Sequence, residues 1–196
     1  MNVSNPENFI QKTFSYDAYR KMLDAAVADV DNPTELQLKI KPYIERNIAI
    51  MDYWENAAAL SPVFEERIAA GLSGIMVVFT EGWCGDAAHI LPFLNKISMQ
   101  SREKIRLRLL LRDENEEIMN AYLTNGSKSI PKLIYLNDTL QEKATWGPRP
   151  VPLENLVPEW KKEGGDVKIL TGKINEWYKA DKGISILEEL ERVLQF

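Results

Sequence analysis

The stretch Trp83-Cys84-Gly85-Asp86-Ala87-Ala88-His89-Ile90-Leu91-Pro92 decides how the rest of the chain is interpreted. It directly follows Ile75-Met76-Val77-Val78-Phe79, an apolar run of strand length that is typical of a strand buried on both faces. From Gly85 to about Met99 the pattern predicts a helix that contains Pro92. Cys84, the single cysteine of the chain, is therefore expected where a buried strand ends and a helix begins.

A sulfur at the start of a helix is a candidate nucleophile. Backbone N–H groups and the helix dipole favour an anion there, and they can lower a thiol pKa from about 8.5 to between about 3.5 and 7.5. Asp86 acts in the opposite direction, because a nearby carboxylate disfavours a second negative charge. The sequence leaves open which effect determines the pKa of Cys84.

Outward from this stretch, strands and helices alternate. The later strands are predicted from Ile105 to Leu111, Pro131 to Leu136 and Gln141 to Trp146, with a turn at Asn137-Asp138 between the last two. The later helices are predicted from Asn115 to Leu123, Leu153 to Lys162 and Ile169 to Leu194, with a break at Gly183. This order predicts an α/β fold in which helices cover a mixed sheet.

Residues 1–70 are predicted to be all-helical. After a loose lead-in over residues 1–10, helices are expected from Ser15 to Asp31, from Pro42 to Ala58, and from Ser61-Pro62 to a stop at Gly71. Aromatic residues at helical spacing are expected to pack in the core: Tyr16, Tyr19, Tyr43, Tyr53 and Trp54. We therefore predict a helical extension, residues 1–70, that packs on an α/β domain, residues 71–196.

The composition argues against several classes of function. Among 196 residues, 24 Lys and Arg face 29 Asp and Glu, a net charge of −5, whereas a nucleic-acid groove needs a basic stripe. No apolar run approaches the roughly 18–20 residues of a membrane span, and residues 1–10 do not have the pattern of a secretory signal. We expect a cytoplasmic protein with no nucleic-acid or membrane partner. With one Cys and one His, neither an internal disulfide, a metal site nor a cofactor is expected.

The stretch around Cys84 resembles the thioredoxin active-site motif Trp-Cys-Gly-Pro-Cys, with Pro92 at the position of the helix-kinking proline. Residues 129–134, Ser-Ile-Pro-Lys-Leu-Ile, resemble the strand whose cis-proline packs beside the thioredoxin sulfur. Residues 147–149, Gly-Pro-Arg, fall where thioredoxins carry a glycine next to the active surface. The chain also resembles a bacterial thioredoxin-like family with an N-terminal helical extension, the string Trp-Cys-Gly-Asp-Ala, and the runs found here at residues 109–115 and 146–150. The resemblance implies a thioredoxin-like fold.

The departures from thioredoxin bear directly on function. Ala87 stands at the position of the second cysteine, and Asp86 stands at the position of the proline between the two cysteines. The buried carboxylate that thioredoxins carry in the preceding strand corresponds to Val78. A dithiol reductase needs a second thiol to attack the mixed disulfide formed by the first. This chain therefore cannot work as a general dithiol reductase.

Two functions fit a single cysteine in this position. In the first, Cys84 exchanges with a protein or a low-molecular-weight thiol or disulfide, and an external thiol resolves the mixed disulfide. In the second, an inactive thioredoxin-like module recognises a peptide or a partner protein. The resemblance implies a groove in which an extended partner adds as a strand. Its lining is expected to come from Trp83, Gly85, Asp86, Ile130, Pro131 and Arg149.

A third function, peroxide chemistry through a sulfenic acid, ranks last. Peroxidases of the resembled fold surround their cysteine with Thr or Ser and Arg, and no such string lies beside Cys84. His89 is not expected to act as its base. Five residues correspond to about 140° of rotation around a helix, so His89 is expected to face solvent or the edge of the core.

Several further side chains have two interpretations each. The run 112–114, Arg-Asp-Glu, is expected to cap a helix and carry surface charge rather than reach the active-site edge. Arg149 either binds a substrate carboxylate or pairs with Asp86, or is a plain surface arginine. Trp83 is expected on the exposed rim of the site, and the pair Trp177-Tyr178 is expected to pack back onto the sheet.

Overall fold

The structure is a computed structural model that describes residues 5–28, 31–164 and 166–194. Its sheet contains β1 (Gly74–Thr80), β2 (Ile105–Leu111), β3 (Lys132–Leu136) and β4 (Glu142–Trp146) in the order β2-β1-β3-β4. β2 runs parallel to β1, while β3 and β4 are each antiparallel to their neighbours. The predicted mixed sheet is confirmed. Every residue of β1 is buried, as its continuous apolar run predicts.

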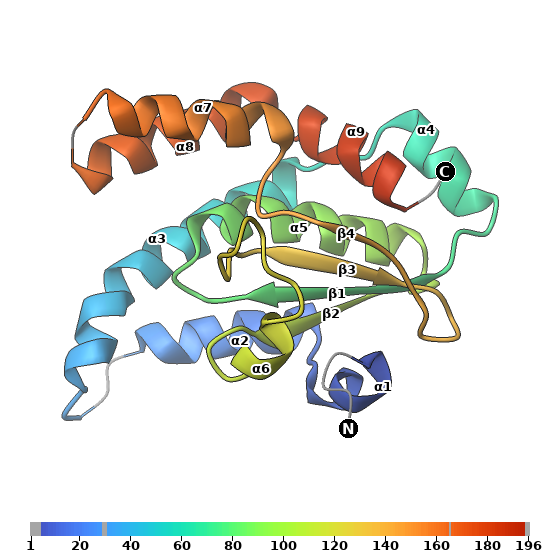
Figure 1. Ribbon diagram of the computed structural model, residues 1–196, viewed down its shortest axis with the longest axis horizontal. Coiled ribbons are helices and arrows are strands. Elements are labelled where there is room, and N and C mark those ends of the chain that lie inside the picture. Colours follow the sequence, from blue (N-terminus) through green and yellow to red (C-terminus); the bar gives the residue numbers. More distant parts are fainter. Residues whose placement is uncertain (1–4, 29–30, 165, 195–196) are drawn as a thin grey trace.

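Helices cover both faces of this sheet (Figure 1). They are α1 (Pro6–Phe9), α2 (Tyr16–Val27), α3 (Glu35–Ala57), α4 (Pro62–Ala69), α5 (Gly85–Gln100), α6 (Glu116–Met119), α7 (Val151–Lys162), α8 (Val167–Asp181) and α9 (Ile184–Val193), with a 3-10 turn η1 (Ile10–Lys12) after α1. In the view of Figure 1, α5 and α9 lie above the sheet and α1, α2 and α6 below it. None of the helices in the described ranges is both long and apolar enough to cross a membrane.

The N-terminal helices differ from the prediction in two places. Residues 6–12 form α1 and η1 rather than a loose lead-in, while residues 1–4 lie outside the described ranges. α3 begins at Glu35 instead of Pro42, because Thr34 and Gln37 form a reciprocal capping box and Pro42 is accommodated inside the helix. The predicted end of the preceding helix includes residues 29–30, which are not described; α2 itself ends at Val27.

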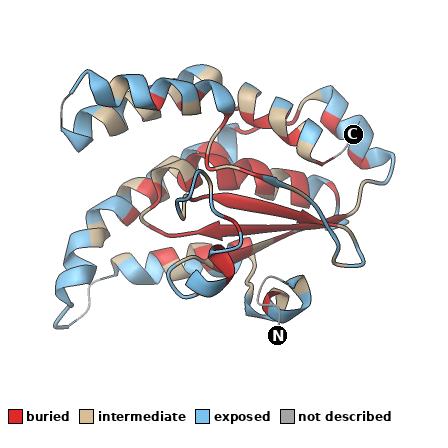
Figure 2. Ribbon diagram, viewed as in Figure 1, coloured by how far each residue is buried: buried red, intermediate tan, exposed pale blue. Residues whose placement is uncertain are grey.

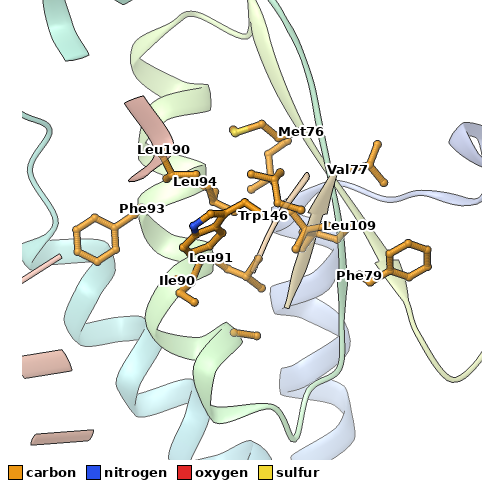
Figure 3. Close-up of a cluster of buried hydrophobic side chains, with 14 of the residues drawn as sticks. Met76, Val77, Phe79, Ile90, Leu91, Phe93, Leu94, Leu109, Trp146 and Leu190 are labelled. Atoms are coloured by element: carbon orange, nitrogen blue, oxygen red, sulfur yellow. The ribbon is translucent and has the colours of Figure 1, made fainter. Parts of the chain in front are cut away.

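The aromatic residues of this region divide between core and surface. Tyr16, Tyr19 and Trp54 are buried as predicted, whereas Tyr43 and Tyr53 are 43% and 54% exposed. The prediction was wrong for these two because α3 buries another face, formed by Ile44, Asn47, Met51 and Trp54. That face packs on α5, whose own apolar side chains gather with those of the sheet and Leu190 of α9 (Figure 3).

The chain leaves the sheet after β4, forms α7 and α8, and returns to it as α9. The predicted break at Gly183 is confirmed, and it separates α8 from α9. Trp177 and Tyr178 do not pack on the sheet: Tyr178 is buried against the His89 ring of α5, and Trp177 is half-buried. The sequence pattern could not show this, because α7 and α8 lie beside the start of α5 rather than over the strands (Figure 1).

Candidate functional site

Cys84 lies between the end of β1 and the start of α5, where it is the N-cap residue of the helix. The backbone N–H of Cys84 donates to the carbonyl of Glu81 at 3.0 Å, which closes a turn between strand and helix. The side chain is 8% exposed, and its Sγ–H donates to the carbonyl of Ile130 at 3.4 Å. The Ile130–Pro131 peptide bond is cis, as the resemblance implies. Three of the predicted site residues, Cys84, Ile130 and Pro131, are therefore brought together.

Burial determines the state of the thiol. It raises the pKa of Cys84 to about 12, and the charge of Asp86 acts in the same direction. Hydrogen bonds from the backbone N–H groups of Ala87 and Asp86 and the charge of Arg149 lower the pKa, but by less. The competition that the sequence left open, between the helix terminus and Asp86, is thus outweighed by desolvation. The sulfur is a neutral thiol at physiological pH.

Asp86, in the first turn of α5, is held by partners from two other parts of the chain. Its Oδ2 accepts hydrogen bonds from Arg149 Nε at 3.2 Å and Arg149 Nη2 at 2.6 Å. Its Oδ1 accepts one from the hydroxyl of Tyr178 at 3.0 Å. Arg149 also donates from Nη1 to Glu154 at 2.9 Å. Of the alternatives considered for Arg149, the structure has the pairing with Asp86.

His89 lies three residues further along α5 and is 1% exposed, so the expectation of a solvent-facing or core-edge position was wrong. Its Nδ1 accepts from Trp54 Nε1 at 2.8 Å, and Nε2 lies 3.0 Å from Asn175 Oδ1. The ring stacks on Tyr178 at 4.2 Å between centroids. These contacts define a neutral tautomer that carries its proton on Nε2. Both nitrogens are engaged away from Cys84, and burial lowers the pKa of His89 to about 4.

Trp83 and Gly85, which flank Cys84, are both half-buried. The guanidinium of Arg112 lies 4.9 Å from the centre of a Trp83 ring, a cation–π contact. Arg112 also pairs with Asp113 at 2.6 Å. The Arg-Asp-Glu run thus reaches the edge of the site, contrary to the expectation that it serves caps and surface charge alone.

The loop before Cys84 is held by residues that the sequence analysis did not identify. Glu81 is buried, and its Oε1 accepts the backbone N–H of Asp113 at 2.8 Å. Burial raises the pKa of Glu81. From the other side, Asn47 of α3 donates through Nδ2 to the carbonyl of Gly82 at 2.9 Å. The position of Glu81, three residues before Cys84, was visible in the sequence, but the contact made by Asn47 had no local signal.

Metal ligands do not gather at this site or elsewhere in the described parts of the chain. No group of three or more His, Cys, Asp or Glu side chains in those ranges is arranged to hold an ion. What the site offers is a neutral thiol, a backbone segment with a cis peptide bond at Ile130–Pro131 that directly precedes β3, and an aromatic rim at Trp83.

Sequence comparisons with known proteins point to one family. A family model described as "Thioredoxin" matches residues 34–161. The thioredoxin of Rickettsia bellii is 27% identical over 97 residues, which cover 50% of this chain and 87% of that protein. The thioredoxin of Rickettsia prowazekii is 24% identical over 97 residues, with the same coverage. A crystal structure of a Pseudomonas aeruginosa protein of unknown function matches 88% of this chain and 97% of its own, with 16% identity and a TM-score of 0.49.

Proposed function

This chain belongs to the thioredoxin family, and from that membership we propose that it binds an extended segment of a partner protein beside Cys84 and Pro131, without thiol–disulfide turnover. The state of the Cys84 thiol carries the proposal. Burial and Asp86 hold its pKa at about 12, and its proton is shared with the Ile130 carbonyl. Because the thiolate is the nucleophile in disulfide exchange, a thiol kept neutral is poorly suited to that reaction.

The backbone at Ile130 supports a role in recognition. Within the described residues, the N–H of Ile130 has no hydrogen-bond partner. Its carbonyl receives the S–H of Cys84, a weak donor, and a carbonyl oxygen has a second lone pair. An extended peptide would satisfy both groups by pairing with Ile130 as a short strand. Trp83, whose ring is in cation–π contact with Arg112, would then contact the side chains of the peptide.

Monothiol exchange is the second candidate. Its supporting observation is the position of Cys84 at the N-terminus of α5, where two backbone N–H groups and Arg149 lower the pKa of the thiol. In this alternative, once water reaches the sulfur, the Cys84 thiolate attacks a protein or low-molecular-weight disulfide, forms a mixed disulfide with one of its sulfurs and expels the other as a thiolate. An external thiol then releases the product, since the sequence contains no second cysteine.

A selection of peptides on the full chain tests the proposal. A displayed library of short random peptides without cysteine is panned in reducing buffer, and the affinities of enriched peptides are then measured. Cys84→Ser keeps a donor for Ile130 and removes thiol chemistry, so we expect affinities within about threefold of the wild type. Trp83→Ala should weaken binding about tenfold, as loss of an interface tryptophan commonly does. Tyr43→Ala, which alters an exposed aromatic residue of α3, should change nothing.

Two outcomes would overturn the proposal. The first is that no peptide is enriched, or that enriched peptides ignore Trp83→Ala. The second comes from panning a cysteine-containing library without reductant. Peptides that are retained through Cys84, released by dithiothreitol and lost in Cys84→Ser would assign the site to monothiol exchange instead.

A further inference from the structure

Cys84 and two of the residues expected to line the groove implied by the thioredoxin resemblance are buried in this structure. Cys84 is 8% exposed and Ile130 is 6% exposed, and Pro131 is buried beside them. We propose that the α7–α8 hairpin, described over residues 151–164 and 166–181, is a cover over this groove that Asp86 and His89 hold shut, and that its displacement gives a partner access to Cys84 and Ile130. This inference rests on the proposed function, because it concerns access to the same site.

Several polar contacts of the α7–α8 hairpin are made with two residues of α5, and Val151 also donates its backbone N–H to Glu189 of α9 at 2.7 Å. Asp86 accepts a hydrogen bond from the hydroxyl of Tyr178 in α8 and forms an ion pair with Arg149. Arg149 in turn forms an ion pair with Glu154 of α7. His89 is hydrogen-bonded to Asn175 of α8 and stacked on Tyr178. The first turn of the helix that carries Cys84 is thus also the attachment point of α8. Charge-assisted hydrogen bonds of this kind are strong when shielded from water.

Apart from these contacts, the α7–α8 hairpin is attached by few fully buried side chains, with Trp160, Ile174 and Trp177 partly buried against the core. Its buried side chains are Leu153 and Val157 in α7 and Tyr178 in α8. Figure 2 shows most of the hairpin as exposed, whereas the sheet and α5 are largely buried. Segments that bury few apolar side chains open locally at low free-energy cost. The hairpin is therefore expected to open more readily than the sheet.

The chain is tightly packed on both sides of the hairpin, at Gly147 before it and at Gly183 after it. Any movement is therefore confined to the segment between these two glycines. Gly147 has a φ of +108°, and a Cβ there would lie 2.3 Å from the carbonyl oxygen of Pro131. Gly183 has a φ of +79°, and a Cβ there would lie 2.2 Å from the ring of Phe93. Such close approaches fit glycine alone. The chain therefore lies against Pro131 shortly before the hairpin and against Phe93 of α5 shortly after it.

Opening would also change the thiol. The main cause of the raised pKa of Cys84 is desolvation, so access of water to the sulfur would lower the pKa toward the ordinary thiol value of about 8.5, at which the thiol is still mostly protonated at pH 7. Loss of Arg149 by itself acts in the opposite direction, because this cation lowers the pKa. An Arg149 substitution would therefore have two opposite effects on the reactivity of the thiol: exposure to water increases it, and loss of the cation decreases it. The sign of the measured change shows which effect is larger.

The test measures how fast a polyethylene glycol maleimide labels Cys84 in the full chain. We expect Arg149→Met to label about tenfold faster than the wild type, although its direct electrostatic effect would slow the reaction. Tyr178→Phe, which removes one hydrogen bond and keeps the ring stack, should label a few times faster. Lys173→Met is the matched control. It breaks the ion pair of Lys173 with Glu163 inside the hairpin and should label at the wild-type rate.

Hydrogen exchange read by mass spectrometry locates the change. In Arg149→Met we expect faster exchange in residues 151–181 and unchanged exchange in β1 and β3. Labelling of Arg149→Met at or below the wild-type rate would overturn the proposal, and so would faster exchange spread equally over the whole chain. Because neither measurement uses a peptide, failure of the cover and failure of the binding function give different results.

Discussion

At the scale of single residues, His89 couples folding to pH. Its pKa is about 4 in the folded chain, because burial penalises the charged ring, against about 6.5 in the unfolded chain. Between these values the unfolded chain binds a proton that the folded chain does not. The stability from this residue is therefore fully present above pH 6.5 and is lost as the pH falls toward 4.

We accordingly expect the free energy of unfolding to fall by about 2 kcal/mol as the pH is lowered from 8 to 5, because of the titration of His89. Urea denaturation of the wild type and of His89→Gln across this range measures the effect. Glutamine does not titrate, so its profile shows the contribution of all other groups, and the difference between the profiles isolates His89. Parallel profiles between pH 7 and pH 5 would contradict the prediction.

The state of Cys84 shows where sequence reasoning at this scale stops. The local motif was sufficient to place the sulfur at a helix start beside Ile130 and Pro131, because strand and helix patterns are encoded by neighbouring residues. It was not sufficient to predict a neutral thiol. The residues that act on Asp86 and His89, namely Arg149, Asn175 and Tyr178, come from far along the chain. When segments distant in the sequence bury a site, the residues next to that site in the sequence carry no pattern that predicts the burial.

At the scale of elements, long apolar runs were the most predictable parts. The strand predicted from Ile105 to Leu111 matches β2 in both bounds, and β1 extends the predicted run by one residue at each end. The helix predicted from Asn115 to Leu123 is much shorter, since α6 ends at Met119. The helical spacing of apolar residues in the sequence continues past Met119, because Tyr122 is buried against Phe79 of β1 although it is not part of a helix.

Gly183 gives a prediction for the connection between two elements. It lies between α8 and α9 with a φ of +79°, and Phe93 leaves no room for a Cβ. Gly164, which directly follows the C-cap of α7, has the same φ, and a Cβ there would have no atom within 4 Å. Gly164→Ala is expected to cost about 1 kcal/mol from backbone strain alone. Gly183→Ala should cost at least about 2 kcal/mol more, because the Phe93 ring is fully buried.

Thermal or urea denaturation of these two variants measures the difference directly. Because φ is matched, strain cancels in the comparison and the remaining loss reports the contact with Phe93. Equal losses in both variants would mean that Phe93 can move aside, and that Gly183 does not anchor the end of the α7–α8 hairpin.

At the scale of the whole molecule, the N-terminal helices take part in the site. α2 and α3 pack together, and α3 lies along α5. Trp54 fixes the His89 ring, Asn47 holds the carbonyl of Gly82, and a Cβ on Gly82 would lie 2.6 Å from Leu23. We therefore propose that residues 1–70 are an extension that braces the loop before Cys84 while the α7–α8 hairpin covers the opposite side.

This arrangement predicts that Asn47→Ala affects the site from a helix outside it. The change leaves the buried carbonyl of Gly82 unpaired, and it also removes a buried Oδ1 that has no partner within the described residues. We expect a net loss of about 1 to 2 kcal/mol of unfolding free energy. Asn56→Ala is the matched control, since its Nδ2 makes a similar bond to the Asp52 carbonyl on the exposed side of α3. That variant should lose less than about 0.5 kcal/mol.

Hydrogen exchange distinguishes a local brace from general packing. If α3 braces the loop, amides of residues 82–86 should exchange faster in Asn47→Ala than in Asn56→Ala, under conditions where both chains are folded. The hydrogen bond of Asn47 ends on the backbone two residues before Cys84, so its loss should loosen the loop before it loosens the sheet. Faster exchange throughout β1 and β3, with no excess in residues 82–86, would show that α3 contributes stability alone and does not position the site.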